Sequence, residues 1–240
     1  MKRLFPLFVA LLFAGNAMAL ENEPKEGVTS MAFLGLNTSH IKHTPYGGKA
    51  GGTMGFRLDY VMPKAHGTYI TAGFDWTMKG GDFDGLYSDP IDAQNIQPGS
   101  EKAKLHYVEI PIRAGFRYNV NKHIGIYGEL GPYFAIGVGG KHKCKVDADG
   151  NQWDDVEDEN TWKAFKKSTT VGRDNFQRWD AGIGFRIGGE YNQHYDLMFG
   201  CDWGITDMWR DKYRDAMYTA QMPLQKAKNF SFTLAFGYRF

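Results

Sequence analysis

The last twelve residues of the chain, Asn229-Phe-Ser-Phe-Thr-Leu-Ala-Phe-Gly-Tyr-Arg-Phe240, alternate between two kinds of side chain. Every even position from Phe230 to Phe240 is large and apolar, and the odd positions between them are small or polar. A period of two is typical of a β-strand with its two faces in different environments. An aromatic face opposed by small and polar residues favours a strand between lipid and a polar interior.

Seven further segments predict strands by the same alternation: 28–38, 50–62, 68–79, 105–118, 124–139, 179–188 and 195–205. The faces of the first of them are the least clear. The long connections (39–48, 80–104, 140–177 and 207–228) alternate with short turns at 63–67, 119–123 and 191–194. Bacterial outer-membrane barrels have this asymmetry, with long loops at one end. We therefore expect an all-β fold, an eight-stranded antiparallel up-and-down transmembrane β-barrel, closed by pairing of 28–38 with the last strand.

Charged residues occupy the polar faces of these strands and must point inward, because lipid does not tolerate them. They are Arg57, Asp59, Asp75, Glu109, Arg113, Arg117, Glu129, Asp180, Arg186, Glu190, Asp196, Asp202 and Arg239. An eight-stranded barrel is just wide enough for side chains to fill it. We expect a plug of ion pairs, and a narrow porin-like channel is the alternative.

Pro111 and Pro132 lie inside two of the predicted strands. Proline cannot donate to the hydrogen-bond ladder, so we expect a bulge or weakened pairing at each.

The first nineteen residues predict an export signal. Lys2 and Arg3 precede an apolar run over 4–14, and Ala17-Met-Ala19 is a small-residue cleavage pattern. We therefore divide the chain into a cleaved signal peptide (1–19), a short polar leader (20–27) and a barrel domain (28–240). The mean hydropathy of −0.45 and the absence of another long apolar run exclude a helical membrane protein. The formal charge of +1 gives no reason to expect nucleic acid as a partner.

The two cysteines, Cys144 and Cys201, could bridge in an exported protein. Cys144 lies at the edge of a predicted loop and Cys201 in mid-strand on the apolar face. We expect two unpaired thiols, because a bridge requires close Cα atoms.

Motifs for catalysis and metal binding are incomplete. Gly137-Val-Gly-Gly-Lys141 lacks the Lys-Ser/Thr of a phosphate loop, and we expect its glycines to permit close backbone approach. Glu109 and Glu129 could serve as an acid/base pair, but the neighbouring arginines favour ion pairing. The stretch 147–158 departs from a calcium loop at its sixth and twelfth positions. His40 with His43, and His142 with Cys144, supply ligand types without a complete set. We assign no catalytic residue, cofactor or metal.

The 140–177 connection combines segregated charge with Trp153, Trp162 and Phe165. A surface that recognises a protein partner and a solvated loop are both open interpretations.

Two motifs, Tyr107-Val-Glu-Ile-Pro-Ile112 and Gly125-Ile-Tyr-Gly-Glu-Leu-Gly-Pro-Tyr133, together with the aromatic C-terminus, resemble the PorT-like outer-membrane β-barrel family of Gram-negative bacteria. The resemblance covers the signal peptide and most of the barrel. It implies the fold and an outer-membrane location, and the type that gives the family its name takes part in protein secretion.

The chain ending, with Thr233, Ala235, Tyr238 and Phe240, also resembles the signal that the barrel-assembly machinery reads, although Ala235 stands where Gly is usual. We expect a non-enzymatic outer-membrane barrel that acts in envelope structure or surface interaction, with outer-membrane lipid and the assembly machinery as partners. A small lipid-modifying enzyme is the alternative.

Overall fold

The computed structural model describes residues 24–43, 47–88, 96–146, 161–166, 176–211, 215 and 225–240. The expected signal peptide lies outside these residues. The strands are β1 (Gly27–Lys42), β2 (Lys49–Val61), β3 (Thr68–Ser88), β4 (Ile96–Asn119), β5 (Ile124–Val146), β6 (Thr161–Lys163), β7 (Trp179–Tyr191), β8 (Tyr195–Gly204) and β9 (Lys228–Arg239). No helix within the described ranges is long and apolar enough to cross a membrane.

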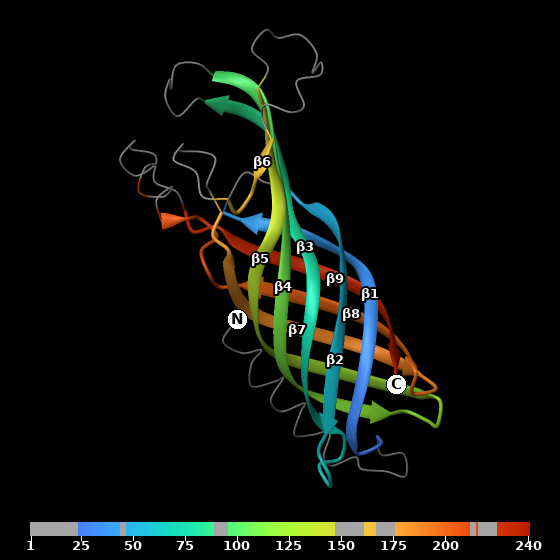
Figure 1. Ribbon diagram of the computed structural model, residues 1–240. Coiled ribbons are helices and arrows are strands. Elements are labelled where there is room, and N and C mark those ends of the chain that lie inside the picture. The colour runs from blue at the N-terminus through green and yellow to red at the C-terminus, as the bar shows by residue number, and fades with distance from the viewer. Residues whose placement is uncertain are drawn as a thin grey trace.

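Eight of these strands close into an antiparallel barrel, in the order β1, β2, β3, β4, β5, β7, β8 and β9 (Figure 1). The seam forms between β1 and β9, where the register runs from Met31 opposite Arg239 to Lys42 opposite Lys228. Because each strand pairs on both sides, the barrel has no open edge that lipid would have to satisfy. The predicted fold class and the predicted closing pair are confirmed.

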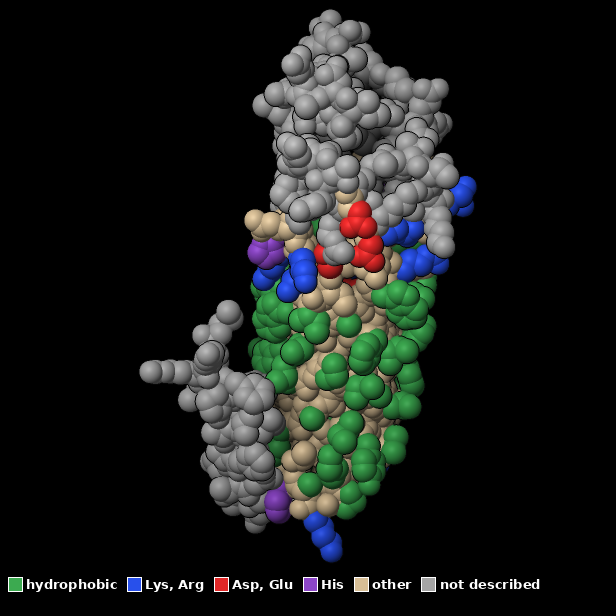
Figure 2. Space-filling view, turned by 90° about the vertical axis from the view of Figure 1, so that its left-hand side faces the viewer, with side chains coloured by type: hydrophobic (Ala, Val, Ile, Leu, Met, Phe, Trp, Pro, Cys, Tyr) green, Lys and Arg blue, Asp and Glu red, His purple; other side chains and the backbone are tan. Residues whose placement is uncertain are grey.

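In β9, the alternation of apolar and polar residues in the sequence matches the alternation of exposed and buried side chains in the structure. Leu234 and Phe236 are more than half exposed on the outer face, whereas Thr233 and Ala235 are buried inside. The same division holds in β2, β7 and β8, and it gives the barrel a wide apolar band (Figure 2). In β1, whose faces were unclear from sequence, Met31 and Phe33 point inward and Leu34 points outward.

Aromatic side chains gather at the two ends of this band. Near the short turns, Tyr191 lies opposite Tyr195, and Tyr195 lies opposite Tyr238. Near the long connections, Trp203 lies opposite Phe230, with ring centroids 5.9 Å apart. Aromatic girdles at both interfaces are typical of barrels that span a bilayer.

The prediction of loops over 80–104 and at the start of 140–177 is wrong in part. β3 continues to Ser88 and pairs there with Ile96, the first residue of β4, and β5 continues to Val146. We call residues 80–88, 96–105 and 140–146, together with β6, the external extension; it rises beyond the other strands (Figure 1). The outward apolar residues end where the lipid ends. Exposed lysines alternate there with buried residues instead, as in Lys102-Ala-Lys-Leu105.

Both prolines interrupt the ladder, as expected. The two residues that follow Pro111 on β4 do not pair with β5. One of the β5 residues that would lie opposite them is Pro132. The register does not shift there. It shifts between His106 and Tyr107, where a bulge marks the start of the external extension.

Candidate functional site

The lower tier of the barrel interior lies near the short turns. Asp59 accepts from Arg117 (2.8 Å) and pairs with Arg239 of the last strand. Glu190 faces the same two guanidiniums, at 2.8 Å from Arg117 Nε and 3.1 Å from Arg239 Nη2. Asp196 adds a further contact 3.6 Å from Arg239. Five strands meet in this cluster, so it ties the closing strand to the opposite wall.

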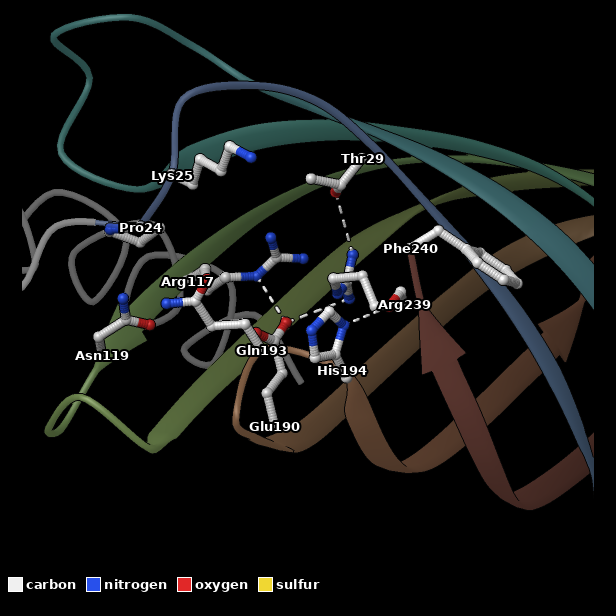
Figure 3. A pocket seen from close by; sticks show the side chains of 10 residues that line it. All are labelled: Pro24, Lys25, Thr29, Arg117, Asn119, Glu190, Gln193, His194, Arg239 and Phe240. Carbon is white, nitrogen blue, oxygen red and sulfur yellow. Dashed lines mark hydrogen bonds and ion pairs between the residues drawn. The ribbon is translucent and has the colours of Figure 1, made fainter.

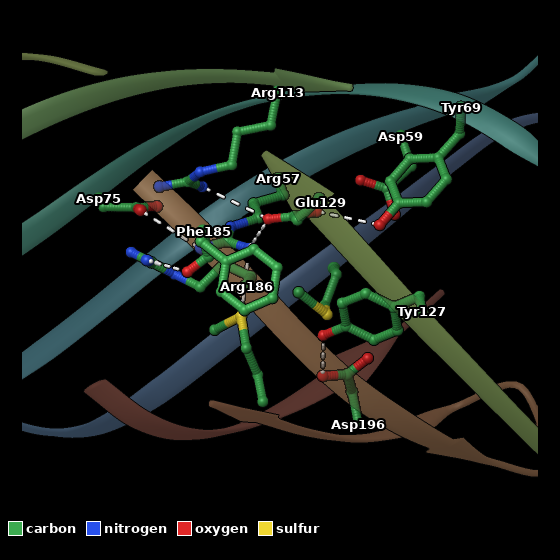
Figure 4. Close-up of polar contacts among 12 residues, drawn as sticks. Arg57, Asp59, Tyr69, Asp75, Arg113, Tyr127, Glu129, Phe185, Arg186 and Asp196 are labelled. Carbon is green, nitrogen blue, oxygen red and sulfur yellow. Dashed lines mark hydrogen bonds and ion pairs between the residues drawn. The ribbon is translucent and has the colours of Figure 1, made fainter. Parts of the chain in front are cut away.

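The middle tier spans the centre of the barrel (Figure 4). Arg57 of β2 donates to Glu129 of β5 at 2.9 Å, and Tyr69 donates to the second oxygen of that carboxylate at 3.0 Å. Arg186 forms a bidentate pair with Asp202, at 2.8 and 2.7 Å. Arg186 is only 3% exposed, and bidentate pairing of a buried guanidinium with a carboxylate fixes geometry as well as charge.

The upper tier is organised around Lys79 of β3. Its Nζ lies 2.6 Å from Glu109 and 3.3 Å from Asp180. Asp180 also accepts from Asn229 (2.8 Å) and Thr206 (2.7 Å). Sequence reasoning did not place Lys79 on the inner face, although its odd number continues the inward parity of Asp75 in the same strand.

All thirteen charged residues predicted to face inward are buried in these tiers or between them. Arg113 joins the middle tier by contacts with Glu129 (3.4 Å) and Asp202 (3.5 Å). Glu109 and Glu129, considered as an acid/base pair, each engage a cation in a different tier. The ion-pair plug is therefore the arrangement that the described interior adopts.

An apolar cap lies above the upper tier of the barrel interior. The cap is a cluster of buried residues from β1, β4, β5 and the external connections, among them Ile41, Leu105, Tyr107, Phe165, Phe176, Met208 and Trp209. Phe176 stacks on Trp209 with ring centroids 5.7 Å apart, and Phe165 meets Tyr107 edge-on at 5.6 Å. The indole of Trp209 donates to the Gln225 carbonyl at 3.2 Å. The cap is thus held by both ring contacts and a backbone anchor.

Two sequence interpretations change at the cap. Phe165, proposed as part of a recognition surface in the 140–177 connection, is 4% exposed and belongs to the cap. Trp153 and the side chain of Trp162 lie outside the described residues. Gly137 was expected to permit close backbone approach, but it makes room for a side chain, because a Cβ there would overlap the ring of Phe165.

A pocket of about 110 Å³ opens at the lower end of the barrel (Figure 3). Arg117, Glu190 and Arg239 of the lower tier line it, together with Lys25 and His194. Pockets that hold small organic ligands have about 300–1,000 Å³, and one water takes about 30 Å³. This pocket has room for a few waters in contact with the lower tier.

The described residues hold no group of three or more His, Cys, Asp or Glu that could bind a metal. His142 is buried beside the cap, where its ring meets Phe176 edge-on with centroids 5.5 Å apart. The calcium-like stretch 147–158 lies outside the described residues. Cys201 is a buried free thiol, and the side chain of Cys144 lies outside the described part.

A family model described as outer membrane protein beta-barrel domain matches residues 19–210. The chain belongs to this family. The closed eight-stranded barrel with its apolar band agrees with this family assignment. The family places the protein in the outer membrane. The finer PorT-like assignment is not part of this match.

Among solved structures, the chain is similar to Ail, the attachment invasion locus protein of Yersinia pestis (14% identity, TM-score 0.42, 90% of this chain and 100% of that chain). It is also similar to OprG of Pseudomonas aeruginosa (10%, TM-score 0.40, 92% and 99%). The N-terminal β-barrel domain of Pseudomonas aeruginosa OprF gives 7% identity and a TM-score of 0.35, covering 88% and 97%. These scores support no statement about activity. No curated protein matches the chain.

Proposed function

We propose that this outer membrane β-barrel acts at the cell surface, in envelope structure or surface interaction, through its external extension. The observation that carries the proposal is the length of three neighbouring strands. β3, β4 and β5 have 21, 24 and 23 residues, whereas a tilted membrane strand needs about 9–11. The surplus builds paired sheet outside the barrel, where it contributes nothing to spanning the membrane.

The filled interior supports the same proposal, because it leaves the outer surface as the part of the protein that can interact with other molecules. The ion-pair tiers and the apolar cap occupy the described interior from one end to the other, which argues against a porin-like role. We assign the chain no catalytic activity, since no geometry among the described residues favours the lipid-modifying alternative.

The remaining partners belong to the same proposal. The signal peptide 1–19 directs export and is then cleaved, and the barrel-assembly machinery engages the C-terminal strand. A protein partner binds through the 140–177 connection, whose strand part extends β5. The PorT-like resemblance of Tyr107–Ile112 supports a role as a secretion-associated component.

Complementation tests the proposal. In cells that lack the protein, we would compare the full chain with a variant in which Asn-Gly replaces residues 83–101, joining the Asp82–Lys102 pair by a short turn. The readouts are detergent resistance, adhesion and secreted protein. We expect the shortened chain to insert, with a heat-dependent shift in gel mobility, but not to restore function. Full restoration by the shortened chain would overturn the proposal.

A further inference from the structure

Lysine side chains form a row across three strands of the external extension. Lys104 of β4 lies directly opposite Lys141 of β5, and Lys141 lies directly opposite Lys163 of β6. Lys102 lies two residues beyond Lys104 on the same face of β4, opposite Lys143. Lys102, Lys104, Lys141 and Lys163 are exposed, and we call these four residues the lysine patch.

This arrangement costs stability unless an anion compensates it. Directly opposed side chains in an antiparallel pair have Cβ atoms about 4.5–5.5 Å apart, and like charges there are destabilising. None of the four lysines forms an ion pair with any residue that the structure describes. Asp82 of β3 lies directly opposite Lys102, but its carboxylate pairs with Lys49. The patch therefore presents concentrated positive charge to its surroundings.

The position of the lysine patch on the barrel indicates what lies next to it. On β4 the outward residues run from Ile110 through Val108 and His106 to Lys104, and on β5 the exposed Val138 precedes Lys141 by three residues. The lysines thus follow directly on the apolar band. On the face that Figure 2 draws, Lys and Arg side chains lie at that edge of the band, with Asp or Glu side chains between them. This is the depth of the headgroups in the outer leaflet, and basic clusters beside a membrane attract anionic headgroups.

We propose that the lysine patch binds the phosphate groups of a phosphorylated glycolipid in the outer leaflet. The inference rests on the proposed function, because it requires the external extension to stand at the outer surface. A lipid suits the site better than a free anion, since the patch shares the outward face with the apolar band and one molecule can contact both.

The test measures binding of the barrel, refolded in zwitterionic micelles, to bisphosphorylated lipid A, to dephosphorylated lipid A and to inorganic phosphate. The variant is the triple substitution Lys104→Gln, Lys141→Gln and Lys163→Gln. Its matched control neutralises three exposed lysines at the opposite end, Lys25→Gln, Lys64→Gln and Lys122→Gln. A heat-dependent mobility shift shows that each protein has folded.

We expect the wild type and the control to prefer bisphosphorylated lipid A, with affinity falling as salt rises. The patch variant should lose roughly a hundredfold, at about fivefold for each lysine. Equal binding of both lipids by the wild type would overturn the proposal, and would fit occupation of the patch by the acidic stretch 147–158 instead. Inorganic phosphate binding as tightly as the lipid would overturn the choice of a lipid.

Failure here and failure of the proposed function give different results. The chain shortened by removal of 83–101 keeps all four lysines, so it should still bind the lipid. The patch variant keeps the whole external extension. Its complementation therefore shows whether the lysines themselves are needed for function.

Discussion

Arg57 Nη1 lies 2.9 Å from Glu129 Oε1, although the two residues come from β2 and β5, which do not pair with each other. The contact therefore crosses the barrel interior and does not run along one wall. Neither side chain is more than 3% exposed. Such a pair acts as a strut between two strands that backbone hydrogen bonds do not connect.

Replacing Arg57 by Met should destabilise the barrel by about 3 kcal/mol, because Glu129 and Asp75 stay buried with fewer partners. Urea unfolding of the reconstituted protein measures the loss. Lys64→Met, at an exposed turn, is the control and should change stability little. The double variant Arg57→Met with Glu129→Leu should lose less stability than the sum of the two single variants, because the two removed groups are partners. Equal stability of Arg57→Met and Lys64→Met would count against the strut.

Two adjacent glycines of β7 should respond differently to alanine. A Cβ on Gly188 would overlap the phenol ring of Tyr127, which donates to Asp196 at 2.8 Å, whereas a Cβ on Gly189 would have its nearest neighbour 3.9 Å away. We expect Gly188→Ala to cost about 1–3 kcal/mol through overpacking, and Gly189→Ala to be tolerated. The same unfolding assay compares them, and the reverse order would disprove the inward packing of Tyr127.

The cap should open when Trp209 is replaced by Ala, because the substitution removes the stack on Phe176 and the bond to the Gln225 carbonyl. Limited proteolysis of intact cells should then cleave the external connections faster, while the barrel keeps its heat-dependent mobility shift. Trp179→Ala removes an indole from the outer face and is the control. Equal cleavage of both variants would show that the cap does not depend on Trp209.

Deleting Phe240 should reduce insertion into the outer membrane. Its backbone N–H donates to the Ser30 carbonyl at 2.8 Å, and its ring meets Tyr238 edge-on with centroids 5.2 Å apart. The loss is expected if the assembly machinery reads the terminal aromatic residue. The fraction of heat-modifiable protein after a short pulse of synthesis measures it, and Phe240→Trp should assemble normally. Normal assembly of the deletion would contradict this role.

The membrane-spanning part of the fold could be predicted because lipid imposes a pattern on sequence. Residues such as Leu234 and Asp202 must take opposite faces, so period two assigned both correctly. The external extension could not be found in this way, since both faces of 80–88 and 96–105 lie beyond the lipid. A strand there alternates without an apolar outer face, as exposed Lys102 and Lys104 do around the buried Ala103.

The sequence predicted most of the charged residues that lie in the barrel interior, but not which of them pair with each other. Parity placed Arg57 and Glu129 inside, and only the closed barrel brings them together across it. The cap was missed because Phe165, Phe176 and Trp209 come from irregular connections, where aromatic residues follow no period. Sequence alone does not distinguish an aromatic residue that is buried over the end of a barrel from an exposed one that binds another protein.

The most direct test of a filled, capped barrel that works through its outer surface is planar-bilayer recording with folded wild-type protein. The tiers of ion pairs and the cap predict that heat-modifiable protein inserts without producing unitary current steps. Steady, reproducible conductance steps from that protein would contradict the account, because they require a water-filled path through the interior.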